Sequence, residues 1–316
     1  MGFDLYVIDD FTLNVGRGIV AGVHLVWAFI LVILWGFAKK DDGSRQDLMY
    51  PLYDSFGSWT DSDIDSPAYI TGSDCDVPKT LDFSAHQSVS PGFKDSEMKL
   101  SLHWIVVMFL VVSAFFQTTA TTLCTNYYIL PPTVRYIEYS ITMPLMTVAI
   151  ALQIGIMSTH TLLLLAVLSW VSMMCMLCND KLVAALQNVT DKLKMIKNKI
   201  PVSQYQREVV TKDEMKKVVF ITQTMGWAII ASIFYVLITA FHSSQKSCDS
   251  PGSAPRFVWA IVYGELVLFC TFGFMQILEM VHAIDEMQAD MGYIILSFVS
   301  KTYLAWLVYG GNFVQA

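Results

Sequence analysis

Three ionisable side chains interrupt stretches of sequence that are otherwise apolar: Glu138, Glu265 and Lys301. Lys301 lies near the centre of YIILSFVSKTYLAWLVYG, and Glu265 lies within VYGELVLF. Glu138 follows Arg-Tyr-Ile close to the start of a third apolar stretch. A charge in an apolar medium is costly, so each position is a candidate functional site.

Three interpretations of Lys301 are open. Its amine can pair with a buried carboxylate, it can extend to the nearer membrane surface, or it can form a Schiff base with a carbonyl compound, as desolvated lysines do. The nearer surface is about ten residues away, roughly 15 Å at the helical rise, which makes the second interpretation difficult.

The composition indicates that lipid surrounds much of the chain. Of the 316 residues, 54% are hydrophobic and 15% are charged, against roughly a quarter charged in ordinary soluble domains. Mean hydropathy is +0.50. Seven continuous apolar stretches are long enough to cross a hydrocarbon core of about 30 Å. They cover residues 17–38, 100–121, 132–153, 159–178, 218–241, 256–279 and 290–311.

These stretches predict an all-α membrane protein, a bundle of seven transmembrane helices that forms a single domain over residues 1–316. Lipid leaves only helices and closed barrels as spanning structures, and the apolar residues run continuously instead of alternating. The sequence boundaries of the helices are less certain than their number.

Charge in the two longest connections predicts the orientation. Residues 39–98 contain twelve Asp and Glu against five Lys and Arg, whereas residues 180–217 contain nine Lys and Arg against five Asp and Glu. Because basic residues are retained in the cytoplasm, 180–217 is expected to be cytoplasmic. The N-terminus is then cytoplasmic, the acidic insert 39–98 is an extracellular loop between the first two helices, and the C-terminus is extracellular. Lys39 and Lys40 argue in the opposite direction.

An amphipathic helix is predicted between Leu182 and Ile200, where apolar residues recur at steps of four and three with lysines between them. Such a helix can lie on anionic lipid, contact a partner, or continue the fourth span into the cytoplasm. The last of these is the simplest interpretation.

Two of the six cysteines, Cys75 and Cys248, fall in segments predicted to be extracellular, where disulfides persist. They are either bonded to each other or two free thiols. Cys175 and Cys178 have the spacing of a metal motif but no companion ligands in their apolar stretch, so no metal site is predicted.

Helix geometry brings Lys301 and Glu138 to a similar depth. Glu138 lies roughly 10 Å below the cytoplasmic face, and Lys301 starts about 16 Å below it. Helical side chains lean toward the N-terminus of their own helix, so the lysine reaches back toward the carboxylate. Ser297 lies one turn before Lys301 on the same face. A cation, an anion and a hydroxyl are therefore expected together.

Two motifs now resemble a known family. RYIEYS in the third span, and ILSFVSKTYLAW followed by VYGG in the last, resemble the heliorhodopsins, retinal proteins whose termini are inverted relative to other microbial rhodopsins. Further resemblances are His24, VVSAFF in the second span, IGI before the fourth, and Gly226-Trp227 in the fifth. The similarity covers most of the predicted membrane part.

The resemblance implies that Lys301 binds all-trans retinal as a protonated Schiff base, that Glu138 is the counterion and that Ser297 forms a hydrogen bond nearby. It also implies that His24 lies in an inner polar cavity. The family usually has a second histidine there, but the matching position in this chain is Gln117, whose amide cannot accept a proton at neutral pH.

Other candidate residues have two interpretations each. Glu265, together with Glu279, Glu138 and His24, distributes titratable groups through the membrane depth and could relay protons; equally, Glu265 could be a neutral, hydrogen-bonded core acid. Large residues of the fifth span would suit the wall of a polyene pocket, although such residues also pack ordinary cores. These are Trp227, Phe234 and Tyr235.

The sequence therefore predicts a light receptor with light-gated proton permeation, and the alternative is a photosensor that signals through a partner protein. It is not expected to be an enzyme, because no catalytic motif lies on a span. A pI near 5.3 and the lack of a basic face exclude a nucleic-acid footprint. Membrane lipid is the expected surrounding, and the resemblance implies a homodimer.

Overall fold

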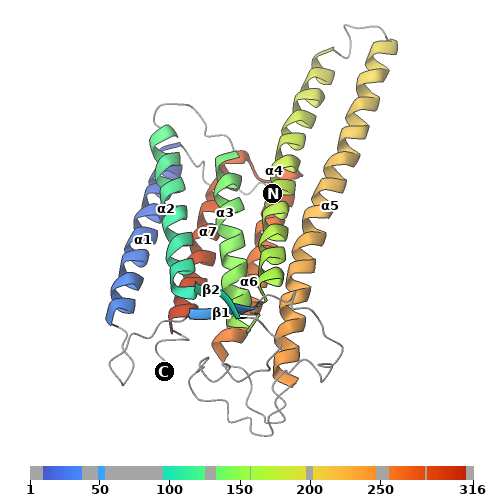
Figure 1. The fold of residues 1–316 in the computed structure, drawn as a ribbon. Helices are drawn as coiled ribbons and strands as arrows, with labels where there is room; N and C mark the ends of the chain where they lie inside the picture. Colours follow the sequence, from blue (N-terminus) through green and yellow to red (C-terminus); the bar gives the residue numbers. More distant parts are fainter. Residues whose placement is uncertain are drawn as a thin grey trace, which may run out of the picture.

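The computed structural model describes residues 10–37, 49–53, 95–124, 133–156, 158–196, 202–246, 256–281 and 283–310. Its seven helices lie side by side in one bundle (Figure 1). They are α1 (Asp10–Phe37), α2 (Leu102–Cys124), α3 (Thr133–Gln153), α4 (Thr159–Ile196), α5 (Val202–Lys246), α6 (Arg256–Met280) and α7 (Glu286–Tyr309).

Six of these helices are long and apolar enough to cross a membrane, and α3 completes the predicted bundle of seven. α3 has 21 residues and packs between α2 and α4, but its sequence carries an arginine, a glutamate, several hydroxyls and Pro144. Most of its residues from Tyr136 onward are buried. The least apolar helix is thus held inside the bundle, where neighbouring helices shield its polar groups from lipid.

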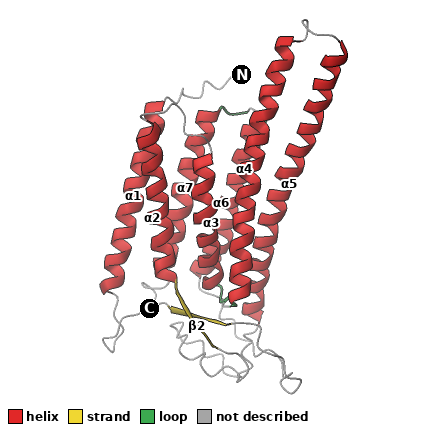
Figure 2. Ribbon diagram, turned by 45° about the horizontal axis from the view of Figure 1, so that its top comes forward, coloured by secondary structure: helices red, strands yellow, loops and turns green. Residues whose placement is uncertain are grey.

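The helices α4 and α5 project beyond the other helices at one end of the bundle (Figures 1 and 2). Up to Ile196, the predicted amphipathic segment is a continuation of the fourth span, because α4 runs unbroken to that residue; residues 197–200 lie outside the described residues. Leu193 is buried and Leu182 is half-buried, whereas Lys192 and Lys194 are exposed. The apolar side of the segment therefore packs on α5. We call this end of the molecule the hairpin end.

Two short strands lie at the opposite end, which we call the strand end (Figure 2). β1 (Met49–Tyr53) pairs antiparallel with β2 (Asp95–Ser101), with Met49 opposite Ser101, and β2 leads directly into α2. The insert predicted between the first two helices therefore adds a small sheet to the helical bundle. Cys75 and Cys248 lie outside the described residues, so their pairing stays a prediction.

Local sequence signals mark the end of α3 and the start of α7. Gly155, in the connection from α3 to α4, has φ of 86°, a left-handed conformation that glycine adopts without strain. α7 begins with a capping box: the Asp285 side chain accepts a hydrogen bond from the Gln288 backbone N–H (2.8 Å), and the Gln288 side chain accepts one from the Asp285 N–H (3.3 Å). This cap fixes where α7 begins and therefore the depth of Lys301.

α6 and α7 approach each other closely at Gly264. The Tyr303 hydroxyl of α7 donates a hydrogen bond to the carbonyl oxygen of Ala260, one turn away on α6 (2.7 Å). A Cβ at position 264 would lie 2.2 Å from that hydroxyl oxygen, closer than any van der Waals contact allows. The glycine therefore permits the packing of the helix that carries Lys301.

We expect Gly264→Ala to destabilise the protein by about 1–3 kcal/mol, because the new methyl group must displace a tyrosine that is held by a hydrogen bond. Thermal unfolding in detergent measures this change. Gly22→Ala is the matched control, since a Cβ at Gly22 meets no atom within 4 Å. Equal midpoints for the two variants would contradict this account of the packing.

Candidate functional site

A buried ion pair joins α7 to α3. Lys301 and Glu138 are each 2% exposed, and the lysine Nζ lies 2.5 Å from Oε1 of the glutamate. Among the described lysines, Lys301 alone is buried. The attraction between the two charges compensates for their loss of hydration only when the remaining donors and acceptors are also satisfied.

Hydroxyl and amide groups complete the shell of this pair. Lys301 Nζ also donates to Ser113 Oγ and to Ser297 Oγ, each at 2.8 Å, so all three ammonium hydrogens have an acceptor. Ser113 in turn donates to Glu138 Oε1 (2.6 Å), and Gln117 donates from Nε2 to Oε2 (2.9 Å). Both carboxylate oxygens are therefore hydrogen-bonded by groups other than the lysine.

Helical spacing explains how the sequence builds this shell. Ser297 and Lys301 are four residues apart on α7, and Ser113 and Gln117 are four residues apart on α2, so each pair presents one face. Ser113 was not predicted as a site residue, although it is the serine of the VVSAFF motif. Its position one turn before Gln117 is the signal that could have found it.

An apolar cavity begins beside the ion pair. The ring of Tyr139, whose centroid is 5.4 Å from Lys301 Nζ, forms one wall of it. The cavity extends from α3 toward α5 and α6. Its other lining residues are Tyr136, Met143, Met173, Met176, Ile230, Phe269, Phe272 and Tyr293. Aromatic and methionine side chains provide an apolar surface that adapts to the shape of a ligand.

The three aromatic residues predicted for this wall occupy different positions. Phe234 is buried, and its ring meets the ring of Phe269 edge-on at 5.2 Å. Trp227 packs against Gly273 of α6, where a Cβ would lie 2.6 Å from the indole ring. Tyr235 is 71% exposed on the outward side of α5, so this placement does not fit a wall of the cavity. The predicted pair Phe234 and Tyr235 are adjacent residues, and adjacent residues on a helix cannot face the same point.

Glu265 is fully buried on α6, at a position separate from the Lys301–Glu138 pair. Its Oε2 accepts a hydrogen bond from Ser300 Oγ (3.1 Å), and Ser300 precedes Lys301 on α7. Its Oε1 has no hydrogen-bond partner among the described residues. This geometry agrees with a core acid and also with a proton-carrying group, so both interpretations of Glu265 stay open.

The remaining predicted proton-path residues lie at two separate places. His24 is fully buried, its ring is 5.8 Å from that of Phe298, and its ring nitrogens have no hydrogen-bond partner in the described part of the chain. Glu279 lies near the hairpin end, 3.9 Å from Arg135. Arg135 and its further partner Asp290 were not predicted, although Arg135 lies one turn before Glu138 in the RYIEYS motif.

Comparison with known proteins identifies the family. The sequence model of the family Heliorhodopsin matches residues 68–313, which is more than half of the chain. The protein belongs to the heliorhodopsin family. A search of curated proteins found no match. As a heliorhodopsin, the protein is a multi-pass membrane protein and a retinal-binding photoreceptor of the rhodopsin type.

The residues of the site fit retinal. A Schiff base requires an amine that is out of water, and its positive charge requires a nearby carboxylate. Lys301 and Glu138 supply both groups, and the side chains that line the small cavity beside Tyr139 are apolar, as the surroundings of a polyene must be. Lys301 would therefore hold the chromophore, and Glu138, Ser113 and Ser297 would surround the nitrogen.

Substitution of Lys301 by alanine is expected to abolish the visible absorption band of protein purified with retinal. The reason is that, among the described residues, the chain offers no second buried amine. The absorption spectrum measures this directly. Lys217→Ala, at an exposed lysine of α5, should keep the band. A visible band that survives Lys301→Ala would place the chromophore elsewhere.

Substitution of Glu138 by glutamine is expected to move the visible band to longer wavelength or to deprotonate the nitrogen at neutral pH. In either case the cause is the same, because a buried cation has lost its anion. A spectrum recorded across neutral pH distinguishes the two results. An unchanged spectrum would mean that another carboxylate is the counterion, with Glu265 as the next candidate.

Proposed function

We propose that this heliorhodopsin is a non-enzymatic receptor that holds all-trans retinal on Lys301 and permits protons to cross the membrane in the light. Retinal supplies the light-driven change of shape when it is bound. In this proposal Glu138 is the counterion of the Schiff base, and the transported ions are protons from the solution beside the membrane. The proposal also includes a homodimer, which the family resemblance implies.

The observation that carries the conduction proposal is the placement of Glu265. Glu265 is a titratable group that is fully buried within a membrane-spanning helix, and its Oε1 has no partner in the described structure, so this oxygen is available to bind a proton. Its bond to Ser300 places it next to the backbone of Lys301. It lies in the half of α6 nearer the strand end, about 14 Å from the start of the helix.

On the opposite side of the ion pair, a polar cavity of about 30 Å³ leads from Glu138 toward the hairpin end. Space of this size holds a water molecule when polar groups line it. Gln117 and Glu138 line one part of the cavity, and Arg17, Arg135 and Asp290 line another. Titratable groups therefore lie on both sides of Lys301, as proton passage requires.

The ion pair can couple the two sides. When Lys301 carries retinal, its nitrogen would keep a single N–H, so it would retain only one of the hydrogen bonds that the free amine makes to Glu138, Ser113 and Ser297. A displacement of this nitrogen would separate its positive charge from Glu138. Ser113 and Gln117 would still donate to the carboxylate. Glu138 would then carry an unpaired negative charge that favours uptake of a proton, and this uptake is the step that links light to proton movement.

A photosensor that signals through a partner is the second candidate, and the projecting part of α4 and α5 favours it. This hairpin extends beyond the bundle (Figure 1) and presents charged residues such as Lys192, Lys194 and Lys217 to solvent. We propose that the hairpin end is cytoplasmic, with the start of α1 at the same end. The basic composition of residues 180–217 supports this orientation.

Substitution of Glu265 by glutamine tests the conduction proposal. Glutamine keeps the shape and the bond to Ser300 but cannot titrate, so we expect the dark spectrum to stay nearly unchanged and the proton photocurrent to fall by about tenfold or more. Photocurrent under voltage clamp, at equal surface expression, measures the effect. The matched control is Glu214→Gln, at an exposed glutamate of α5.

Two results would contradict the proposal. A photocurrent of full size in Glu265→Gln would return Glu265 to a structural role. A wild-type protein that photocycles normally but carries no current under any proton gradient would favour the photosensor.

A further inference from the structure

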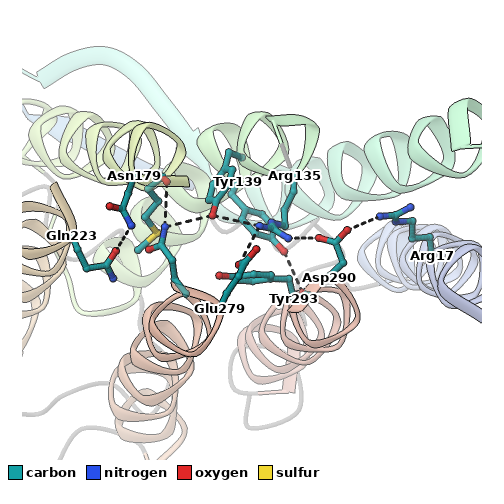
Figure 3. Close-up of polar contacts among 11 residues, drawn as sticks. Arg17, Arg135, Tyr139, Asn179, Gln223, Glu279, Asp290 and Tyr293 are labelled. Atoms are coloured by element: carbon teal, nitrogen blue, oxygen red, sulfur yellow. Dashed lines mark hydrogen bonds and ion pairs between the residues drawn. The ribbon is translucent and has the colours of Figure 1, made fainter. Parts of the chain in front are cut away.

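A layer of polar contacts crosses the bundle between the retinal site and the hairpin end (Figure 3). Its centre is Arg135, which forms a hydrogen-bonded ion pair with Asp290 of α7 and lies 3.9 Å from Glu279 of α6. Asp290 also pairs with Arg17 of α1 at 3.4 Å. One arginine of α3 thus connects three other helices.

Aromatic rings enclose the same guanidinium. The centre of the Arg135 guanidinium lies 3.9 Å from the ring centroid of Tyr293 and 5.0 Å from that of Tyr136, which are cation–π distances. The Tyr136 hydroxyl also accepts a hydrogen bond from Gln276, at 3.5 Å, and Gln276 donates to the carbonyl oxygen of Met176 on α4.

A further hydrogen bond joins α4 to α5: the side-chain amide of Asn179 donates to Oε1 of Gln223 at 2.7 Å.

The residues of this layer lie at helix ends on one side of the bundle. Arg135 is the third residue of α3, Asp290 the fifth of α7 and Glu279 the last but one of α6. Glu138 follows Arg135 by one turn, about 4.5 Å deeper along α3. The layer therefore separates the buried ion pair from the solvent at the hairpin end.

The polar cavity described above ends at this layer. Arg17, Arg135 and Asp290 line it together with Glu138 and Ala120. Arg135 has a side-chain exposure of 11% and Asp290 of 15%, so both are nearly buried where they line the cavity. The guanidinium and its carboxylate partners fill the end of the cavity with side chains that are held to one another by ion pairs.

We propose that Arg135, held by Asp290 and Glu279, is the gate between the Lys301–Glu138 pair and the solvent at the hairpin end. The gate opens when α6 or α7 moves and separates the carboxylates from the guanidinium. Its role in proton passage rests on the proposed function, whereas its role as a barrier to solvent does not. The two roles are therefore tested by different measurements.

The barrier to solvent is tested with a cysteine placed inside the cavity. In full-length protein loaded with retinal and kept in the dark in detergent, Ala120→Cys places a thiol on the wall of the cavity that Arg135 and Glu138 also line. A small cationic methanethiosulfonate should label this thiol slowly. Adding Arg135→Gln should raise the labelling rate by about tenfold or more, because loss of the cation removes its ion pairs with Asp290 and Glu279 and loosens the layer.

Controls are present within the same chain. Lys217→Gln removes one positive charge from an exposed ion pair and should leave the labelling rate at position 120 unchanged. Cys175, Cys178 and Cys270 serve as internal references, since their labelling should not depend on Arg135. The visible band reports folding of each variant. If Arg135→Gln yields no pigment, Arg135→Gln with Asp290→Asn replaces it, because the double variant removes both charges of the pair.

The gate proposal is wrong if the labelling rate is the same with and without Arg135 in the variants that fold, or if the thiol is already labelled rapidly beside Arg135. A wild-type protein without photocurrent, combined with faster labelling in Arg135→Gln, would overturn the conduction proposal and support Arg135 as a solvent barrier.

Discussion

The structure depends on the burial of one ammonium and one carboxylate at the centre of the bundle. Removing one partner of such a pair costs about 3–5 kcal/mol, since the other charge is left uncompensated in an apolar medium. The chain meets this constraint with three helices at once: α7 supplies Lys301 and Ser297, α3 supplies Glu138, and α2 supplies Ser113 and Gln117. These three helices must therefore keep their relative positions along the bundle axis.

Several local features serve that requirement. The capping box at Asp285 fixes the first turn of α7, and the close contact of Gly264 with Tyr303 fixes α7 against α6. α3 carries so many polar groups that it is the one described helix of the bundle that falls short of an apolar span. This departure from a hydrophobic sequence is what allows α3 to supply both Glu138 and, one turn earlier, Arg135.

Much of this arrangement could be predicted from the sequence because it follows from helical rise and side-chain direction. The number of helices, the shared depth of Lys301 and Glu138 and the position of Ser297 all depend on spacing within a helix. The contact between Arg135 and Asp290 joins residues 155 apart in sequence, and no local pattern specifies it. The outward direction of Tyr235 depends on how α5 is rotated against α6, which a weakly amphipathic helix does not reveal.

The two halves of the bundle present different barriers to a proton. Between Lys301 and the hairpin end, the barrier consists of paired charges that enclose a small polar cavity, so it can open by separation of ion pairs. On the other side, Glu265 is buried and is hydrogen-bonded to Ser300, so passage there depends on whether this carboxyl group changes its protonation. The Lys301 nitrogen lies between the two barriers. In the conduction proposal, proton flow in the light requires both barriers to respond to the same movement. One helix, α7, carries Lys301, Ser300 and Asp290 and therefore contacts both barriers.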